Sequence, residues 1–298
     1  MTQGTSRAMC AGATRRGRVV GLQEVRIAGP RGKTVRVVGR RGAGLPSLWW
    51  PDLGWGAEAW LPLLHALPRQ GGAVWAVDPP GHGGSEDLET VDGADVVAVW
   101  HSLLEFVGRP AVVGGHALGA VAALMGLPWV ETRVAGVVLL DGGAEERPRA
   151  ETPLDRRQCV RDWHAAHRWP DWNAFWEAMG ERGPLDQAAR AALRTWVQER
   201  HGRVEPRLSP TLAAQYLEWQ ATYRLDALWP WPGPALLVHA GTASPAGVAA
   251  LARAMPRLRV VAVPEAGHEL LQWAPGVAAL VTAFLGSLGG RGNADPAW

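Results

Sequence analysis

Residues 112–120 read Val112-Val113-Gly114-Gly115-His116-Ala117-Leu118-Gly119-Ala120. A short β-branched run breaks into glycines and continues into an alanine-rich segment, which predicts a strand, a tight turn and the start of a helix. The small residues around Ala117 suit a sharp turn, because a bulky side chain there would collide with the neighbouring strand or helix. We therefore expect an elbow between a strand and a helix, with Ala117 at its tip.

The same alternation of strand and helix runs along most of the chain. The predicted strands, which begin with a hairpin, cover residues 19–28, 34–39, 45–50, 73–78, 111–114, 134–140, 235–240 and 258–263. The predicted helices cover 57–68, 91–107, the segment after the elbow, the segment that ends at 255, and 270–285. Crossovers of this length join parallel strands. The order predicts an α/β fold with a mostly parallel eight-stranded sheet and helices on both faces.

The chain changes character between the sixth and seventh predicted strands. Residues 144–232 are helical in pattern and rich in tryptophan, so we expect a helical cap inserted into a core of residues 17–143 and 233–286. Residues 1–16 and 287–298 are predicted to be flexible ends. A chain of 298 residues with 47% apolar content is long enough for one such core and an insertion, but not for three independent domains.

Cysteine usage and hydropathy favour a cytoplasmic protein. Cys10 and Cys159 lie far apart in the sequence, so neither a disulfide framework nor a zinc site is indicated. Residues 1–23 contain no apolar stretch of signal-peptide length, and no later window reaches the roughly 18 apolar residues of a membrane span. We expect a soluble, cytoplasmic chain that does not contact a membrane.

Four ordered motifs make the chain resemble the α/β-hydrolase family. Gly115-His116-Ala117-Leu118-Gly119 stands where the family reads G-x-S-x-G, and it lacks only the central hydroxyl. Residues 78–85, which read Asp-Pro-Pro-Gly-His-Gly-Gly-Ser, are similar to the family's D-x-P-G-H-G-x-S loop. Asp141 ends the sixth strand, and Gly267-His268 follows the last strand. The resemblance implies an α/β-hydrolase fold with a cap after the sixth strand.

The resemblance also implies an acid and a base for nucleophilic catalysis. His268 stands where the family keeps its catalytic histidine. Relatives place the acid after the sixth or the seventh strand, and the second position here holds Ser244, or Ala243 if the register slips by one. Asp141, 24 residues beyond Ala117, is therefore the expected acid. Several polyketide thioesterases and the haloalkane dehalogenases of the family are similarly built.

The oxyanion hole departs from the family pattern. One donor would be the backbone N–H of Leu118, and the other would lie near Leu53, in the loop after the third strand. That loop reads Pro51-Asp52 where relatives read His-Gly. Proline removes an N–H, and an aspartate would oppose negative charge developing on the substrate.

Aromatic residues of the cap and of the loops near it are the candidate substrate contacts. They suggest an apolar cleft between cap and core for a bulky, polyketide-like small molecule or carrier-bound acyl chain, although tryptophans at helical spacing can equally fill a core. The candidates are Trp55, His116, Trp163, Trp169, Trp172 and Trp176. No nicotinamide, flavin or phosphate motif is present, so no cofactor is expected. His164 and His167 lack further ligands nearby, so no metal is expected.

Residues 15–41 are strongly basic. Either they form a solvated hairpin face, or they dock an acidic partner such as a carrier protein; nucleic acid is disfavoured because no binding motif accompanies the charge. The basic residues, set against one acidic residue, Glu24, are Arg15, Arg16, Arg18, Arg26, Arg31, Lys33, Arg36, Arg40 and Arg41.

Three accounts fit the alanine at position 117. In the first, which we prefer at this point, Ala117 replaces a serine and inactivates an esterase or thioesterase, since losing a triad nucleophile costs on the order of a million-fold in rate. In the second, Ala117 is native and His268 with Asp141 acts as a general base in a cyclase, lyase or isomerase. In the third, the chain is a non-catalytic protein that binds a ligand.

Overall fold

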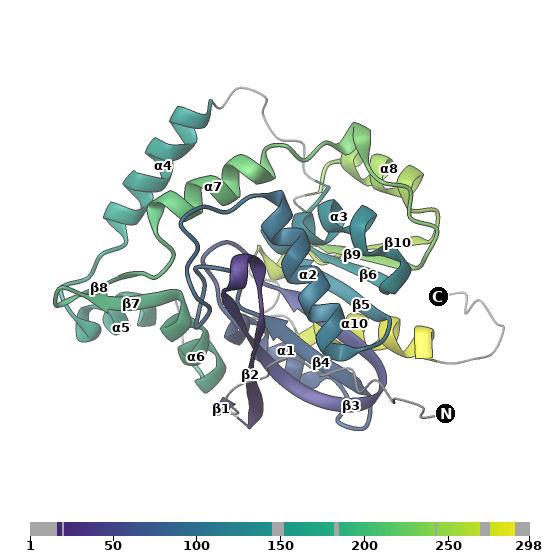
Figure 1. Cartoon of the computed structure of the whole chain (residues 1–298), viewed down its shortest axis with the longest axis horizontal. Helices are drawn as coiled ribbons and strands as arrows, with labels where there is room; N and C mark the ends of the chain where they lie inside the picture. The colour runs from purple at the N-terminus through teal and green to yellow at the C-terminus, as the bar shows by residue number, and fades with distance from the viewer. Residues whose placement is uncertain are drawn as a thin grey trace, which may run out of the picture.

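The computed structural model describes residues 17–19, 21–144, 152–181, 185–241, 243–268 and 275–289 (Figure 1). Its main sheet has eight strands. Their bounds are β1 Gly17–Val19, β2 Leu22–Ala28, β3 Thr34–Trp50, β4 Gly72–Val77, β5 Ala111–His116, β6 Val134–Leu140, β9 Ala235–His239 and β10 Leu258–Ala262. The end of β3 pairs in parallel with β5, and β5, β6, β9 and β10 follow in parallel. The predicted α/β fold with a mostly parallel eight-stranded sheet is confirmed.

Two of the predicted strands are one strand, β3, that folds back on itself. Residues 37–40 of β3 run antiparallel to β4, whereas residues 47–49 pair with residues 74–76 in the same chain direction. The two backbones approach so closely that a Cβ on Gly72 would overlap the main chain of β3. The count of eight still holds because β1, of which only Val19 was predicted, is an additional strand before β2; Gly21, where φ is 80°, lies between them.

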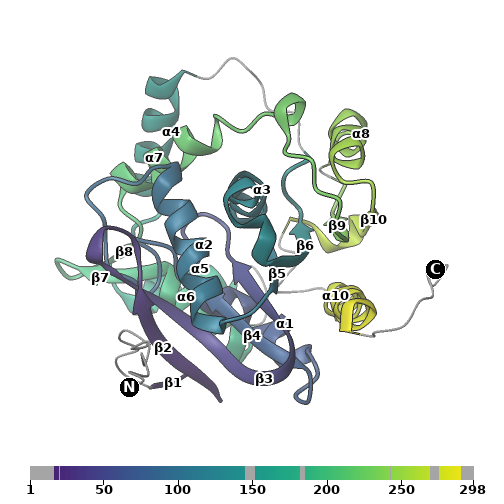
Figure 2. The same ribbon diagram turned by 45° about the vertical axis from the view of Figure 1, so that its right-hand side comes forward.

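Helices cover both faces of the sheet (Figures 1 and 2). One face carries α2 (Gly93–Val107), α3 (Leu118–Val130) and α8 (Pro245–Ala254), and the other carries α1 (Leu61–Ala66) and α10 (Pro275–Gly289). Successive residues of β6 alternate between the two apolar clusters: Val137 and Leu139 pack on the first, and Val138 and Leu140 on the second. A strand buried on both faces is the expected state in such a sheet.

The structure corrects the predicted end of the chain. The closing helix was expected over 270–285, with a flexible tail from residue 287, but α10 continues to Gly289. The other residues predicted to be flexible, 1–16 and 290–298, lie outside the described residues. Within the described ranges no helix combines the length and the hydropathy that crossing a bilayer requires.

The segment between β6 and β9 holds most of the remaining elements. They are α4 (Pro153–Ala166), α5 (Trp172–Gly180), α6 (Gln187–Trp196), β7 (Val197–Arg200), β8 (Arg203–Pro206) and α7 (Pro210–Gln220), with α4 beside α7 (Figure 1). Thr152, Asp171, Asp186 and Ser209 cap the four helices, since each side chain accepts a backbone N–H of the first turn. The β7–β8 hairpin was not predicted; its turn, His201-Gly202, has φ values of 51° and 71°.

Candidate active site

Ala117 lies at the tip of a strained elbow between β5 and α3. Its φ of 48° and ψ of −108° are unfavourable for a residue with a Cβ. The backbone N–H of Ala117 donates to the carbonyl of Leu140 at 2.9 Å, which ties the elbow to β6. A Cβ on Gly115 would overlap the backbone of Gly119, and a Cβ on Gly119 would overlap the carbonyl oxygen of Trp50. The glycines are therefore required by close backbone contacts, and the predicted elbow is present.

Asp141 and His268 meet beside this elbow. Asp141 ends β6 with a φ of 45°, and its side chain is buried. Oδ1 accepts the backbone N–H of Ala240 at 2.8 Å, and Oδ2 lies 2.7 Å from Nδ1 of His268. Ser244, at the other position where relatives carry the acid, caps α8 by accepting the N–H of Gly247. The structure thus brings together the acid and base that the sequence predicted.

A second carboxylate, that of Asp52, completes the group. Asp52 Oδ1 accepts the backbone N–H of Leu118 at 3.1 Å, and Oδ2 lies 3.7 Å from Nε2 of His268. Burial raises the pKa of Asp52, but the contact with His268 and the hydrogen bonds from the backbone N–H groups of Leu118 and Leu53 outweigh it and hold the pKa below its ordinary value. Asp52 is therefore ionised at neutral pH.

This contact changes the role of the predicted oxyanion hole. Leu118 and Leu53 were expected to donate their N–H groups to substrate, but both groups hydrogen-bond to the Asp52 carboxylate. The site consequently presents a negative charge where a hydrolase would stabilise one. The aspartate in the loop was the signal in the sequence; that its side chain reaches Leu118 could not be deduced from sequence spacing.

His268 is a cation in this environment. Its hydrogen bond to Asp141 and its contact with Asp52 raise the pKa of His268 to about 10, although burial opposes them. The predicted general base is therefore protonated at neutral pH and acts first as a hydrogen-bond donor or acid. His116, a predicted substrate contact, is buried, and its Nε2 donates to the backbone carbonyl of His268 at 2.7 Å. His116 thus positions the loop of His268.

His116, Asp141 and His268 also form the group of possible metal ligands in the described part of the chain, with ligand atoms within 4.8 Å of one another. The Asp141 and His268 atoms of this group are hydrogen-bonded to each other. The geometry suits an acid and base pair at least as well as a metal site. His164 and His167 do not belong to the group.

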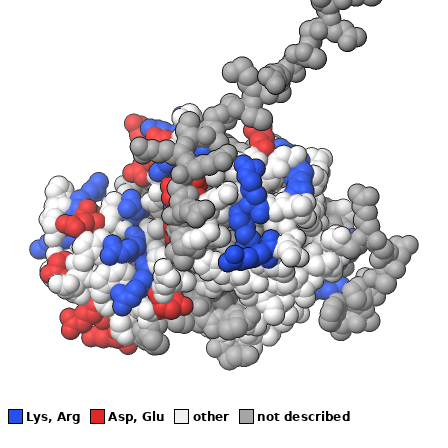
Figure 3. Space-filling view, turned by 90° about the horizontal axis from the view of Figure 1, so that it is seen from below, with Lys and Arg blue, Asp and Glu red and all other residues white. Residues whose placement is uncertain are grey.

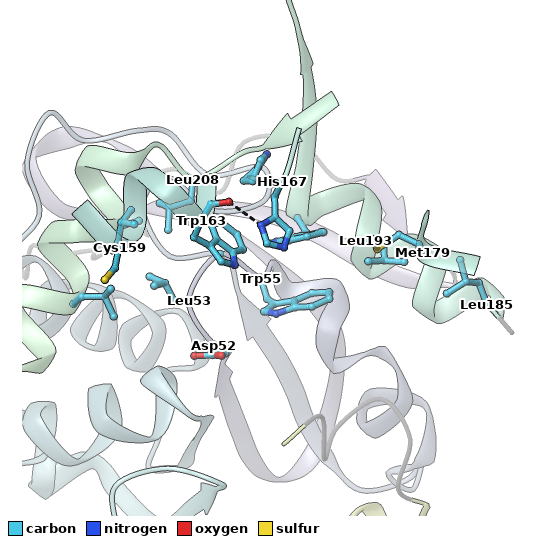
Figure 4. A pocket seen from close by; sticks show the side chains of 16 residues that line it. Asp52, Leu53, Trp55, Cys159, Trp163, His167, Met179, Leu185, Leu193 and Leu208 are labelled. Atoms are coloured by element: carbon cyan, nitrogen blue, oxygen red, sulfur yellow. Dashed lines mark hydrogen bonds between the residues drawn. The ribbon is translucent and has the colours of Figure 1, made fainter. Parts of the chain in front are cut away.

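A cavity of about 710 Å³ opens above Asp52, between the segment 153–217 and the loop that follows β3 (Figure 4). Asp52 lies at one end of the lining side chains, and the rings of Trp55 and Trp163 lie between it and His167 in this view. Trp55 stacks on Trp196, with ring centroids 5.7 Å apart. Two predicted substrate contacts, Trp55 and Trp163, thus line the cavity, and Trp196 and His167 join them without having been predicted.

Trp169, Trp172 and Trp176, which were predicted to contact substrate, are placed elsewhere. They pack around Phe175 in an apolar cluster that is distinct from the two clusters of the main sheet and shares Met179, Leu193 and Trp196 with the cavity wall, but they do not line the cavity themselves. Trp172 Nε1 donates to Glu199 at 3.0 Å. These half-buried tryptophans pack against the apolar interior of the inserted segment, which is close to the alternative that helical spacing left open.

In the part of the basic segment that the structure describes, several basic side chains are engaged within the molecule, whereas Arg15 and Arg16 lie outside the described residues. Arg36 is buried and pairs with Glu58 at 2.5 Å and Asp78 at 2.8 Å. Although burial lowers it, these carboxylates hold the pKa of Arg36 above its ordinary value. Arg40 donates to backbone carbonyls, among them that of Leu67 at 2.7 Å. Arg36 therefore cannot form part of a docking surface, and docking of an acidic carrier protein remains a prediction. Seen from below, the basic side chains form separate groups (Figure 3).

Comparison with known proteins places the chain in a family. The sequence profile of the alpha/beta hydrolase family matches residues 42–280, and the chain belongs to this family. No curated protein sequence matches it significantly.

The fold is shared with solved structures of different activities. The chain is similar to E-2-(acetamidomethylene)succinate hydrolase, with a TM-score of 0.71 and 23% identity over 89% of this chain and 99% of the other. It is also similar to the thioesterase domain from the curacin biosynthetic pathway, with a TM-score of 0.66 and 19% identity over 89% and 98%. The bottromycin epimerase BotH, in complex with bottromycin A2, gives a TM-score of 0.64 and 21% identity over 88% and 98%.

Proposed function

We propose that the chain is a cofactor-independent enzyme that moves a proton at a carbon next to a carbonyl, as an isomerase, lyase or cyclase does. One observation carries the proposal: the carboxylate of Asp52 occupies the place of the oxyanion, bound by the N–H of Leu118 and beside the cationic ring of His268. Together with Ala117, this arrangement provides an acid and a base but no nucleophile.

The roles follow from the charges of the two groups. Asp52, ionised and in contact with the cavity, takes the proton from the substrate carbon, and the electrons of the broken C–H bond move onto the carbonyl oxygen. The Nε2–H of His268 donates to that oxygen or returns a proton, while Asp141 holds the ring through Nδ1. Return of the proton to the same or a neighbouring carbon gives isomerisation, and loss of a leaving group gives elimination. This assigns the role of the base to Asp52, whereas the sequence had suggested His268.

An inactivated hydrolase is the second candidate. The elbow at Ala117 and the Asp141–His268 pair favour it, and a hydrolase and a thioesterase are among the solved structures that share the fold. Against it, the pKa of His268 is raised to about 10, so at neutral pH its ring is mostly protonated and poorly suited to accept the proton of a serine at position 117. Its oxyanion would also compete with Asp52 for the N–H of Leu118. The epimerase among the structural neighbours supports non-hydrolytic chemistry on this fold.

The lining of the cavity favours a bulky apolar substrate, free or bound to a carrier, of the kind made in polyketide-like biosynthesis. Its walls are tryptophan, leucine and methionine side chains, and Asp52 marks its polar end. Such a pocket binds through apolar area and orients the substrate by a few polar contacts.

Proton abstraction can be tested without the natural substrate. Nitrobenzisoxazole loses the single C–H proton of its isoxazole ring to a base, the N–O bond breaks as the C≡N bond forms, and a coloured cyanonitrophenolate results. We expect the chain to open this ring and Asp52→Asn to slow it by about 10²–10⁴-fold, the usual contribution of a positioned base. Ring opening unaffected by Asp52→Asn would contradict the assignment.

The hydrolase candidate has its own test. Ala117→Ser restores the hydroxyl, and we expect no covalent labelling by a fluorophosphonate at pH 7. Labelling that depends on His268, or a burst of product from an activated thioester, would establish the second candidate in place of the first.

A further inference from the structure

We propose that the cavity above Asp52 selects a cationic ligand, namely a substituted ammonium or amidinium group carried on an apolar body. The inference deepens the proposed function in that it takes this cavity to be the substrate pocket. It names the charge of the substrate, which neither the family nor the structural neighbours specify.

The charge of the lining residues is the first argument. Asp52 is the one acidic residue among the described residues that line the cavity, and no lysine or arginine lines it; the other ionisable groups are Cys159 and His167. The Asp52 carboxylate has roughly four acceptor positions. The backbone N–H groups of Leu118 and Leu53 use two of them, and His268 approaches a third only to 3.7 Å. The carboxylate can therefore accept a further donor from the cavity. Asp52 and Asp141 together outnumber the cationic ring of His268 between them, so the group keeps a net negative charge that disfavours an anionic ligand.

The aromatic rings are the second argument, and the chain contains its own comparison. Outside the cavity lining, two tryptophans of the Phe175 cluster carry cations: Arg194 lies over the ring of Trp172 at 5.0 Å, and Arg190 lies over that of Trp176 at 5.1 Å. The indole rings of the cavity, from Trp55, Trp163 and Trp196, carry no such cation from the residues that the structure describes. Ring faces attract cations more strongly when the surroundings exclude water. Within the described residues, Trp55 stacks on Trp196 and Trp163 stacks on His167 at 4.3 Å, so one face of each ring is covered by another ring and none by a lysine or arginine.

The size of the cavity supplies the apolar body. A volume of about 710 Å³ exceeds what an ammonium head fills, and Met179, Leu185 and Leu193 line the part away from Asp52. A ligand with its cation near Asp52 and Trp55 would bury its apolar remainder against these side chains.

A matched series of three probes tests the sign of the preferred charge. The probes are para-(hydroxymethyl)phenyltrimethylammonium, its uncharged isostere para-tert-butylbenzyl alcohol, and para-(hydroxymethyl)benzoate, with binding to the full chain measured by ligand-observed NMR at pH 7. We expect the ammonium probe to bind at least about tenfold more tightly than the alcohol, and the benzoate to bind least. Equal affinity for the ammonium probe and the alcohol, or preference for the benzoate, would overturn the inference.

Two variants and a control show where the selectivity arises. Asp52→Asn and Trp163→Leu should each reduce the preference for the ammonium probe over the alcohol several-fold. Trp172→Leu, which removes an equally large ring that does not line the cavity, should leave this preference unchanged. If the preference survived both cavity variants, the cation would bind elsewhere and the inference would fail. These affinities are independent of the ring-opening rate, so failure here and failure of the proposed proton transfer are distinguishable.

Discussion

Replacing Asp52 by asparagine should lower the pKa of His268, and the size of the change follows from the geometry. The pKa of His268 is raised to about 10 by two carboxylates, with Asp141 as the larger cause and Asp52 as the second. Asp52→Asn keeps the shape of the side chain and removes one negative charge.

The Coulomb energy of the pair sets the magnitude. Opposite unit charges at the 3.7 Å between Asp52 Oδ2 and His268 Nε2 attract by about 4.5 kcal/mol at an effective dielectric constant of about 20, and by about 1.1 kcal/mol in bulk water. The His268 side chain is 51% exposed, so the effective value lies between these limits. At about 1.4 kcal/mol per pH unit, the pKa of His268 should fall by about one to three pH units in Asp52→Asn.

An NMR titration of the His268 ring protons from pH 5 to 11 measures this change. Asp141→Asn is the internal comparison, because the hydrogen bond of Asp141 to Nδ1 is the larger cause and its loss should lower the pKa further. A change of less than about half a pH unit in Asp52→Asn, or a larger change there than in Asp141→Asn, would refute the picture of a ring held between two carboxylates.

Three further predictions concern stability. Because folding raises the pKa of His268, the protonated ring stabilises the folded chain fully below the ordinary pKa of 6.5, and this stabilisation is lost as the pH rises through about 10. Urea unfolding at pH 6 and at pH 10 should therefore show a loss of stability that the His268→Asn variant lacks. Arg36→Met should cost about 3–5 kcal/mol in the same assay, since it leaves Glu58 and Asp78 buried without their cation, while Arg253→Met on the surface of α8 should stay within about 0.5 kcal/mol. Gly119→Ala should abolish soluble expression through the clash with Trp50, whereas Gly180→Ala, which has open space around its Cβ, should fold normally.

The parts of the site that local sequence determines were predictable. The elbow follows from small residues around Ala117, each needed for a backbone contact within a few ångströms. Asp141 follows from its place at the end of an apolar strand, because parallel strands bring their carboxyl ends to one edge. Local pattern is sufficient in both cases.

The remaining parts depend on contacts between distant residues. That Asp52 reaches Leu118, 66 residues away, depends on the path of the loop after β3 and on one side-chain rotamer. The charge of His268 depends in turn on Asp52. Helical spacing could not show that Trp163 turns toward the cavity while Trp172 turns into a core, and a count of arginines could not show that Arg36 lies against buried carboxylates.

Ala117 and Asp52 are best explained together. A nucleophilic serine requires an empty oxyanion hole and a neutral histidine, and Asp52 opposes both: it accepts the N–H of Leu118, and it is, after Asp141, the second cause of the raised pKa of His268. A carboxylate base, conversely, has no use for a hydroxyl at position 117. A single serine-to-alanine exchange in a working hydrolase would leave Asp52 unexplained. A chain whose chemistry depends on Asp52 accounts for both residues, and for this reason we favour proton transfer over inactivated hydrolysis.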